Sequence, residues 1–431
     1  MLFAAINLFI LFTVAYPGYV TADAIDELDQ FLTGAYSNHH PFYHALLLKL
    51  FTEAGRGIFG NINAGIALFL VIQILFLAVC FGYAAMTLYE TGLPLSVIVT
   101  AAALWLLSPY QIAYSVTVWK DIPFGGALLL FTTALFRIMK GIGSRKANEC
   151  VLIIGAVGFA LMRSNGLIAL AITFIAVFFV YRKEDRKLLL LLAGVIIGAF
   201  LLKHPVLSLL HVTQPDTAET LSIPVQQVAK VITEGGDLNG QEAELQLFFE
   251  TEKVPSDYRE FISDPIKNHM RKKGYINGHM GEFIRLWAKI GVKNPGLYIK
   301  AWIDQTRGYY NGGYEYWIYS DYVMENDLGI TAGTPVESIR NLLYKWYEKY
   351  YGKSIFQPLH SIGFHVWLMA LCFFAGAVHK KKEFLLSVPQ LAIILTLLIS
   401  TPVFCEFRYA YSLFTTAPFL FFTTFGRHSS N

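Results

Sequence analysis

Long apolar runs separated by short polar breaks dominate the hydrophobic pattern of this chain. A membrane-spanning helix needs about 20 residues, and on that measure the pattern predicts an all-α polytopic membrane protein with about ten transmembrane helices. Several runs are shorter than this and are expected to tilt. The predicted helices cover residues 1–15, 62–87, 94–109, 122–139, 150–162, 166–181, 187–203, 359–378, 384–401 and 409–426.

The polar stretches between these runs divide the chain into three predicted domains. Residues 1–203 form an N-terminal transmembrane module whose first external loop is 16–61. Residues 204–357 are long and polar enough for a mainly helical extracytoplasmic domain, and residues 358–431 carry the C-terminal transmembrane helices. The first apolar run lacks a basic region before it, which leaves a signal peptide or a retained anchor open, and we favour the anchor.

Two of the polar segments carry helix signals of their own. Apolar residues recur at helical spacing through 22–32, which predicts a short helix lying on the membrane surface with its carboxylates at the lipid boundary. Within the polar domain, Pro224 suits the first turn of a helix over 225–232, and Asn239 suits the cap of a helix over 243–249.

Composition supports a membrane protein and argues against a nucleic-acid-binding protein. Of 431 residues, 55% are hydrophobic and only 15% are charged, whereas a soluble domain has roughly 25% charged residues. The mean hydropathy is +0.47. The net charge of +3 comes without a basic stripe or a nucleic-acid motif, so nucleic acid is not an expected partner. The four cysteines stand singly and are interpreted as small apolar residues.

Basic residues set the predicted orientation. Ten alternating spans bring the basic clusters to one side, which the positive-inside rule assigns to the cytoplasm of a plasma (inner) membrane. Both termini are then cytoplasmic, and the polar loops and the 204–357 domain are extracytoplasmic. The clusters are Lys140 with Arg145 and Lys146, Arg182 with Lys183, Arg186 and Lys187, His379 with Lys380, Lys381 and Lys382, and Arg427.

Carboxylates and imidazoles concentrate in the 16–61 loop, where Asp23, Asp26, His39 and His40 stand close in sequence. A charge near the bilayer is costly without a partner, so this concentration suggests a functional site. A solvated helix face is the alternative for any single aspartate. Adjacent histidines do not face the same way, and no third ligand has a standard metal spacing. We therefore expect no required cofactor, and the spacing gives no support for a divalent metal.

Cations occur at the outer ends of several apolar runs. Lys120 and Asp121 open one run just before Pro123, where a helix start also favours an anion. Arg163 lies in a turn, and Arg408 precedes the last run. Each could be an ordinary interfacial anchor. Together they face the acidic loop across one membrane surface and suit an anionic substrate at headgroup level, because Arg binds phosphate through two parallel hydrogen bonds.

These motifs occur in an order that resembles the polytopic glycosyltransferases of the GT-C superfamily, which includes protein O-mannosyltransferases, lipid A aminoarabinose transferases and bacterial members of uncharacterised function. The resemblance is clearest over 16–200 and 400–426. It rests on Pro17-Gly18, Asp23, Asn38-His39-His40-Pro41, Trp119-Lys120-Asp121-Ile122-Pro123, Arg163-Ser164-Asn165-Gly166 and Arg408-Tyr409.

The resemblance implies an enzyme that moves a sugar from a polyprenyl-phosphate carrier to a glycan, lipid or protein acceptor outside the membrane, with membrane lipid as its surroundings. It implies a general base at Asp23 or, failing that, Asp26. The chain has Asp23-Ala24 where the family has an Asp-Glu pair, which leaves the choice open. The expected phosphate ligands are Lys120, Arg163, Arg408 and Arg56, and the expected substrate-positioning residues are His39, His40, Asp121, Asn165 and Tyr409.

Other functions fit part of the pattern. A ligase or polymerase of surface polysaccharide would use similar chemistry. A transporter or flippase of a lipid-linked saccharide would also need cations at headgroup level, but it should show internal repeats or midplane charges, which the sequence lacks. A tyrosine-rich stretch over 309–322 suits either an acceptor platform or an interfacial aromatic belt.

Overall fold

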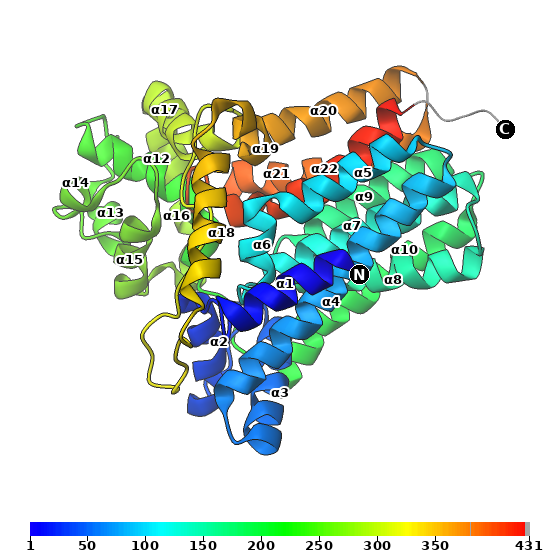
Figure 1. Cartoon of the computed structure of the whole chain (residues 1–431). Coiled ribbons are helices and arrows are strands. Elements are labelled where there is room, and N and C mark those ends of the chain that lie inside the picture. The colour runs from blue at the N-terminus through cyan, green and yellow to red at the C-terminus, as the bar shows by residue number, and fades with distance from the viewer. Residues whose placement is uncertain (380, 427–431) are drawn as a thin grey trace. The chain divides into compact units, whose positions relative to one another are not determined.

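A computed structural model describes residues 1–379 and 381–426, and these residues form an all-helical protein (Figure 1). Strand pairing among them is limited to isolated bridges such as Tyr19 with Thr117. The predicted all-α class is therefore confirmed. Lys380 and Arg427, which belong to predicted basic clusters, lie outside the described residues.

The chain divides into two compact units. The first comprises Met1–Thr213, Trp317–Ile393 and the chain from Phe407 onward, and the second comprises Gln214–Tyr316 and Ile394–Glu406. The second unit is thus smaller than the predicted 204–357 domain.

Packing explains why residues 317–357 group with the first unit. The Trp346 indole donates to the carbonyl oxygen of Leu107 at 3.0 Å, and the Tyr114 hydroxyl donates to the carbonyl oxygen of Ile318 at 2.6 Å. These aromatic contacts tie the segment to the helices of the first unit.

The helices of the first unit account for every predicted apolar run. They are α1 (Leu2–Thr13), α2 (Ala22–Thr33), α3 (Phe42–Phe59), α4 (Ile62–Glu90), α5 (Leu95–Leu107), α6 (Pro109–Ser115), α7 (Asp121–Lys140), α8 (Arg145–Leu161), α9 (Gly166–Tyr181), α10 (Arg186–Leu201), η1 (Leu202–Val206), α11 (Leu207–Leu209), α18 (Glu337–Tyr351), η4 (Ser354–Phe356), α19 (Gln357–His360), α20 (Ile362–Val378), η5 (Lys382–Ser387) and α22 (Phe407–Phe425), while α21 (Val388–Ser400) begins in the first unit and ends in the second.

Four of the described helices are long and apolar enough to cross a membrane: Ile62–Glu90, Asp121–Lys140, Arg186–Leu209 and Lys382–Ser400. Two bent pairs, Leu95–Leu107 with Pro109–Ser115 and Ser354–His360 with Ile362–Val378, raise the number to six if each is one span. This fits a helical membrane protein. The count of about ten spans stays a prediction.

Helix α7 is the central helix of the first unit and packs against α4, α8 and α22 (Figure 1). It is mostly apolar and almost wholly buried. Close approach of α8 depends on Gly155, because a Cβ atom there would lie 2.5 Å from the backbone nitrogen of Phe131. Tight packing along α7 fixes the position of its first turn.

The two ends of α7 differ in charge. The far end, Lys140, pairs with Glu383, and nearby ion pairs join Arg145 to Asp185 at 2.8 Å and Lys187 to Glu149 at 2.7 Å. Basic clusters that are distant in sequence thus gather beyond this end. The helix has 20 residues, so its first residue, Asp121, lies about 30 Å from that basic region.

The second unit is built around one helix, α12 (Ser222–Thr233), which matches the helix predicted after Pro224. The predicted Asn239 cap is wrong: Gln241 occupies the N-cap position of α13, without a capping side-chain hydrogen bond, and Asn239 has a left-handed φ of 56°. Asn tolerates that conformation, and here its N–H bonds to the Asp237 side chain. The other helices are η2 (Thr217–Leu221), α13 (Glu242–Phe248), α14 (Val254–Asp257), α15 (Asp264–Lys273), α16 (Ile276–Lys293), α17 (Pro295–Thr306) and η3 (Arg307–Tyr309).

Candidate functional site

Asp23 lies in the first turn of α2, a helix predicted over 22–32 and observed over Ala22–Thr33. The segment before it runs alongside the one before α7, since the Tyr19 N–H donates to Val116 at 2.8 Å and the Val118 N–H donates back to Tyr19 at 2.9 Å. The Trp119 indole then donates to the hydroxyl of Thr21 at 2.7 Å. These contacts bring the starts of α2 and α7 together.

The carboxylate of Asp23 is held between two cations. Its Oδ2 accepts from the Lys120 Nζ at 2.7 Å and from the Arg408 Nη1 at 2.7 Å. The two partners are 97 and 385 residues away in the sequence, at the starts of α7 and α22. The Asp23 side chain keeps 21% of its surface exposed, so the cluster is recessed but reachable from outside.

The charges around Asp23 control its ionisation. Burial disfavours its charged form, but the positive charges of Lys120 and Arg408, together with His40, outweigh burial and hold the pKa of Asp23 well below its usual range. Two formal positive charges face one negative charge. The excess of one positive charge suits a singly charged anion.

His40 connects the enclosed carboxylate with the surface. Because an ammonium has no acceptor, the Lys120 Nζ donates to the His40 Nδ1, at 2.8 Å. The His40 Nε2 lies 3.7 Å from Asp26, whose side chain is 68% exposed. The ring of His39 meets that of His40 edge to face at 4.7 Å. Of the two candidate aspartates, Asp23 is therefore the one that contacts both cations.

A second ion pair stands beside the first. Asp121, which is 1% exposed, pairs with Arg163, and the Arg163 Nε donates to the Asn165 side chain at 3.3 Å. The guanidinium groups of Arg163 and Arg408 lie 4.8 Å and 5.2 Å from the centre of the Tyr409 ring. Tyr409 thus links the two ion pairs, and Asp121 neutralises much of the charge of Arg163.

Lys203 supports this region and was not anticipated from the sequence, where it ends an apolar run. Its buried ammonium donates to the carbonyl oxygens of Ala160 at 2.9 Å and Arg163 at 2.7 Å. A buried ammonium needs such acceptors, and they fix the turn that carries Arg163. The signal available in the sequence is one lysine within an apolar run, just before Pro205.

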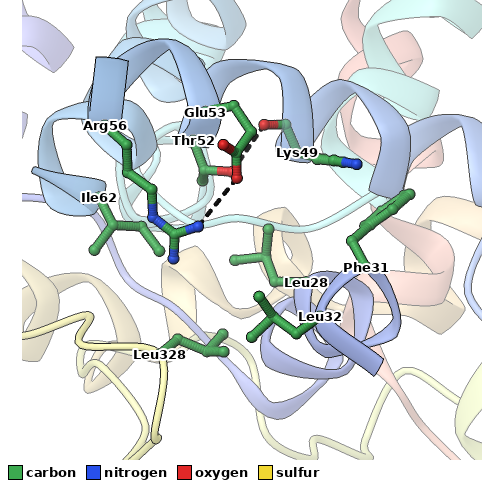
Figure 2. Close-up of a pocket in the computed structure, with 9 residues that line it drawn as sticks. All are labelled: Leu28, Phe31, Leu32, Lys49, Thr52, Glu53, Arg56, Ile62 and Leu328. Carbon is green, nitrogen blue, oxygen red and sulfur yellow. Dashed lines mark hydrogen bonds and ion pairs between the residues drawn. The ribbon is translucent and has the colours of Figure 1, made fainter. Parts of the chain in front are cut away.

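Arg56 lies elsewhere in the first unit. It belongs to α3, forms an ion pair with Glu53 at 3.0 Å and lines a cavity of about 370 Å³ between α2 and α3 (Figure 2). The structure thus brings Lys120 and Arg408 into contact with Asp23 and Arg163 to the adjoining Tyr409 ring, and Arg56 is not part of that cluster.

Across residues 1–379 and 381–426, no group of three or more His, Cys, Asp or Glu side chains is arranged to hold a metal ion. In the same residues Cys80, Cys372 and Cys405 are buried free thiols and Cys150 is exposed.

A family model described as a family of unknown function, DUF6020, matches residues 32–431. The chain belongs to this family. The matched region includes His40, Lys120, Arg163 and Arg408, and it begins within α2, after Asp23. No curated protein and no solved structure is detectably similar to the chain.

The low pKa of Asp23 predicts how the stability of this DUF6020 member depends on pH. A carboxyl whose pKa is lower in the folded state stabilises the fold above its unfolded pKa, about 3.9, and loses that contribution as the pH falls through the folded value. The difference in melting temperature between the parent and Asp23→Asn should therefore be constant between about pH 5 and 8 and shrink below about pH 4.

Thermal unfolding in detergent at a series of pH values measures this difference. Asp26→Asn is the matched control, because it removes an exposed carboxylate and should shift the melting temperature little at any pH. A parent-to-variant difference that already shrinks between pH 7 and 5 would contradict the assigned ion pairs.

Proposed function

We propose that this protein is a membrane glycosyltransferase that moves a sugar from a polyprenyl-phosphate-linked donor to a cell-envelope acceptor at the extracytoplasmic face. The observation that carries the proposal is the Asp23 carboxylate held between Lys120 and Arg408. A sugar phosphodiester carries one negative charge, which matches the excess positive charge of this cluster. The residue types also match the needs of the reaction, a base next to cations.

The proposed reaction is a direct displacement at the anomeric carbon. The acceptor hydroxyl oxygen forms the new bond to this carbon while the bond to the phosphate oxygen breaks and its electron pair stays on the phosphate. Asp23 takes the hydroxyl proton. Lys120 and Arg408 stabilise the second negative charge that develops on the leaving phosphate. The displacement inverts the anomeric configuration and needs no separate proton donor, because phosphate leaves readily without one.

The low pKa of Asp23 fits this role. The carboxylate stays ionised at physiological pH, and the acceptor hydroxyl becomes strongly acidic as its oxygen bonds to the sugar, so a weak base is sufficient. When Lys120 and Arg408 turn toward the donor phosphate, Asp23 loses part of its neutralising charge and its pKa rises. Donor binding would in this way strengthen the base.

The neighbouring groups position these residues. Asp121 and Asn165 hold Arg163 in place, and Tyr409 orients Arg163 and Arg408 through its ring. The starts of α7, α9 and α22 bring the positive ends of three helix dipoles toward the proposed phosphate. His40 and His39 would position the acceptor, which is a glycan, a lipid or a protein.

The topology we propose is that of a GT-C enzyme in the plasma membrane with about ten spans, counting α1, α8, α9 and α22 as short or tilted spans. The basic end of α7 would face the cytoplasm with both termini, and the Asp23 end and the 204–357 region would face outward. Support comes from the separation of the two ends of α7, with ion-paired basic clusters at one and the Asp23 cluster at the other.

Deletion of the gene tests the function. We expect cells without the protein to lose one sugar substituent from an envelope component and to accumulate a polyprenyl-phosphate sugar, because the donor is no longer consumed. Mass spectrometry of envelope glycans and extracted lipids measures both, and expression of the parent protein should reverse both.

The same measurement separates the alternatives. A ligase or polymerase would lose whole glycan chains rather than one sugar, and loss of a flippase would leave the lipid-linked saccharide on the cytoplasmic leaflet. Unchanged glycans together with unchanged lipid-linked sugars would refute the glycosyltransferase proposal.

A further inference from the structure

The cavity between α2 and α3 has its own chemistry (Figure 2). It has a volume of about 370 Å³ and extends to Ile62, the first residue of α4 and of a candidate membrane span. In a membrane, a cavity at the end of a span lies at the level of the lipid headgroups. The residues that line it are Leu28, Phe31, Leu32, Lys49, Thr52, Glu53, Arg56, Ile62 and Leu328.

The polar lining comes from one face of α3. Lys49 and Arg56 are seven residues apart, two helical turns, with Glu53 between them. The Lys49 Nζ lies 4.8 Å from the centre of the Phe31 ring, and the Arg56 guanidinium reaches from α3 toward Leu28 and Leu328 (Figure 2). Two positive charges and one negative charge leave an excess of one positive charge.

A ligand can replace Glu53 as the partner of Arg56 in this cavity. Arg56 and Glu53 keep 38% and 55% of their side-chain surface exposed, and an exposed pair of this kind is weak. A phosphate can therefore displace the Glu53 carboxylate and accept two hydrogen bonds from the Arg56 guanidinium. Glu53 would then oppose the ligand, which gives the site a carboxylate whose removal should strengthen binding.

Apolar side chains are exposed beside the cavity. Leu32 and Phe59 are 60% and 62% exposed; Leu32 lines the cavity itself, and Phe59 follows Arg56 by three residues on the same face of α3. Exposed apolar groups next to accessible cations are typical of sites that take an amphiphile with an anionic head. A soluble phosphate compound would leave these apolar groups unused.

We propose that this cavity binds the phosphodiester headgroup of an anionic phospholipid, with its acyl chains lying over Leu32 and Phe59. Lys49 and Arg56 supply the charge that selects the anion. A zwitterionic choline lipid would bring a third positive charge to the same place and is disfavoured. The site is separate from the Asp23 cluster in its residues, and its occupancy does not depend on the proposed reaction.

Native mass spectrometry of the full chain in non-ionic detergent tests the proposal. Titration with short-chain phosphatidylglycerol and with phosphatidylcholine should show the anionic lipid binding about tenfold more tightly. Arg56→Ala and Lys49→Ala should each remove most of this preference, and Glu53→Gln should increase it. Lys345→Ala, which removes an exposed cation from α18, is the matched control and should leave the preference unchanged.

Two outcomes would overturn the proposal. One is equal binding of the two lipids by the parent protein, or a preference that persists in both Arg56→Ala and Lys49→Ala. The other is competition by glycerol 3-phosphate at the concentrations at which phosphatidylglycerol binds, which would identify a soluble phosphate as the ligand. If the cation variants fail to fold, Glu53→Gln decides, since a preference it fails to increase contradicts the site.

Discussion

Asp23→Asn should lower the rate of sugar transfer by about 10²–10⁴-fold, the range attributed to general-base catalysis. Asparagine keeps the shape of the side chain and an oxygen that accepts from Lys120 and Arg408, but it lacks the negative charge and cannot accept the hydroxyl proton. The effect should therefore fall on kcat, while the KM for the donor changes little. The measurement is transfer from a polyprenyl-phosphate sugar donor to cell-envelope extract by purified protein in proteoliposomes.

The contrast with the cations makes this result specific. Lys120→Met and Arg408→Met should raise the KM for the donor as well as lower kcat, because these residues are proposed to hold the phosphate in both the bound and the reacting state. Asp26→Asn should keep most of the activity, since Asp26 is largely exposed and meets the cluster only through His40. If Asp23→Asn reached the membrane at normal levels and transferred sugar at the parental rate, Asp23 would not be the base.

The Asp23 cluster could be anticipated because its members stand at the ends of apolar runs. Once helices are assigned to those runs, residues at the starts of α7 and α22 must lie at helix ends, and the basic clusters indicate which ends share a side. The helix α2 could also be predicted, since its apolar residues keep helical spacing. What the pattern does not supply is distance, and the contacts of Asp23 with Lys120 and Arg408 come from packing.

Arg56 shows where this reasoning fails. Like Arg408, it is an arginine predicted to lie on the outer side of the membrane. It belongs, however, to α3 (Phe42–Phe59), a helix that the sequence analysis did not identify. The buried face of α3 includes His44 and Thr52 alongside its apolar residues, which obscures the apolar pattern. Without that helix, the position of Arg56 relative to Asp23 could not be inferred.

The ion pair between Asp121 and Arg163 could not be predicted from the sequence either. Asp121 was expected to position substrate, which stays a prediction, and the structure pairs its buried carboxylate with Arg163. The pairing depends on how closely α8 and α9 approach α7, which is set by small residues such as Gly155 and by the contacts of Lys203. The grouping of residues 317–357 with the first unit was also not visible in the sequence, because the packing of α18 through Trp346 is a long-range contact.

Arg163→Met should destabilise the protein by about 3–5 kcal/mol, because it leaves the carboxylate of Asp121 buried without its partner. Asp121 is only 1% exposed, so water cannot replace the guanidinium. The measurement is the free energy of unfolding in mixed detergent micelles, with the parent and variant compared at the same pH. Asn165→Ala, which removes the 3.3 Å hydrogen bond to Arg163 and leaves both charges of the ion pair in place, is the control and should cost about 1 kcal/mol.

A double-mutant cycle separates the structural role of Arg163 from a role in binding the donor. Asp121→Asn together with Arg163→Met removes both charges, so most of the lost stability should return. If transfer activity returns with it, Arg163 acts by holding the site together, as its pairing with Asp121 indicates. If stability returns and activity does not, Arg163 contacts the donor phosphate directly, and the phosphate site extends from Lys120 and Arg408 to the start of α9. If Arg163→Met alone were as stable as the parent, the buried ion pair between Asp121 and Arg163 would be contradicted.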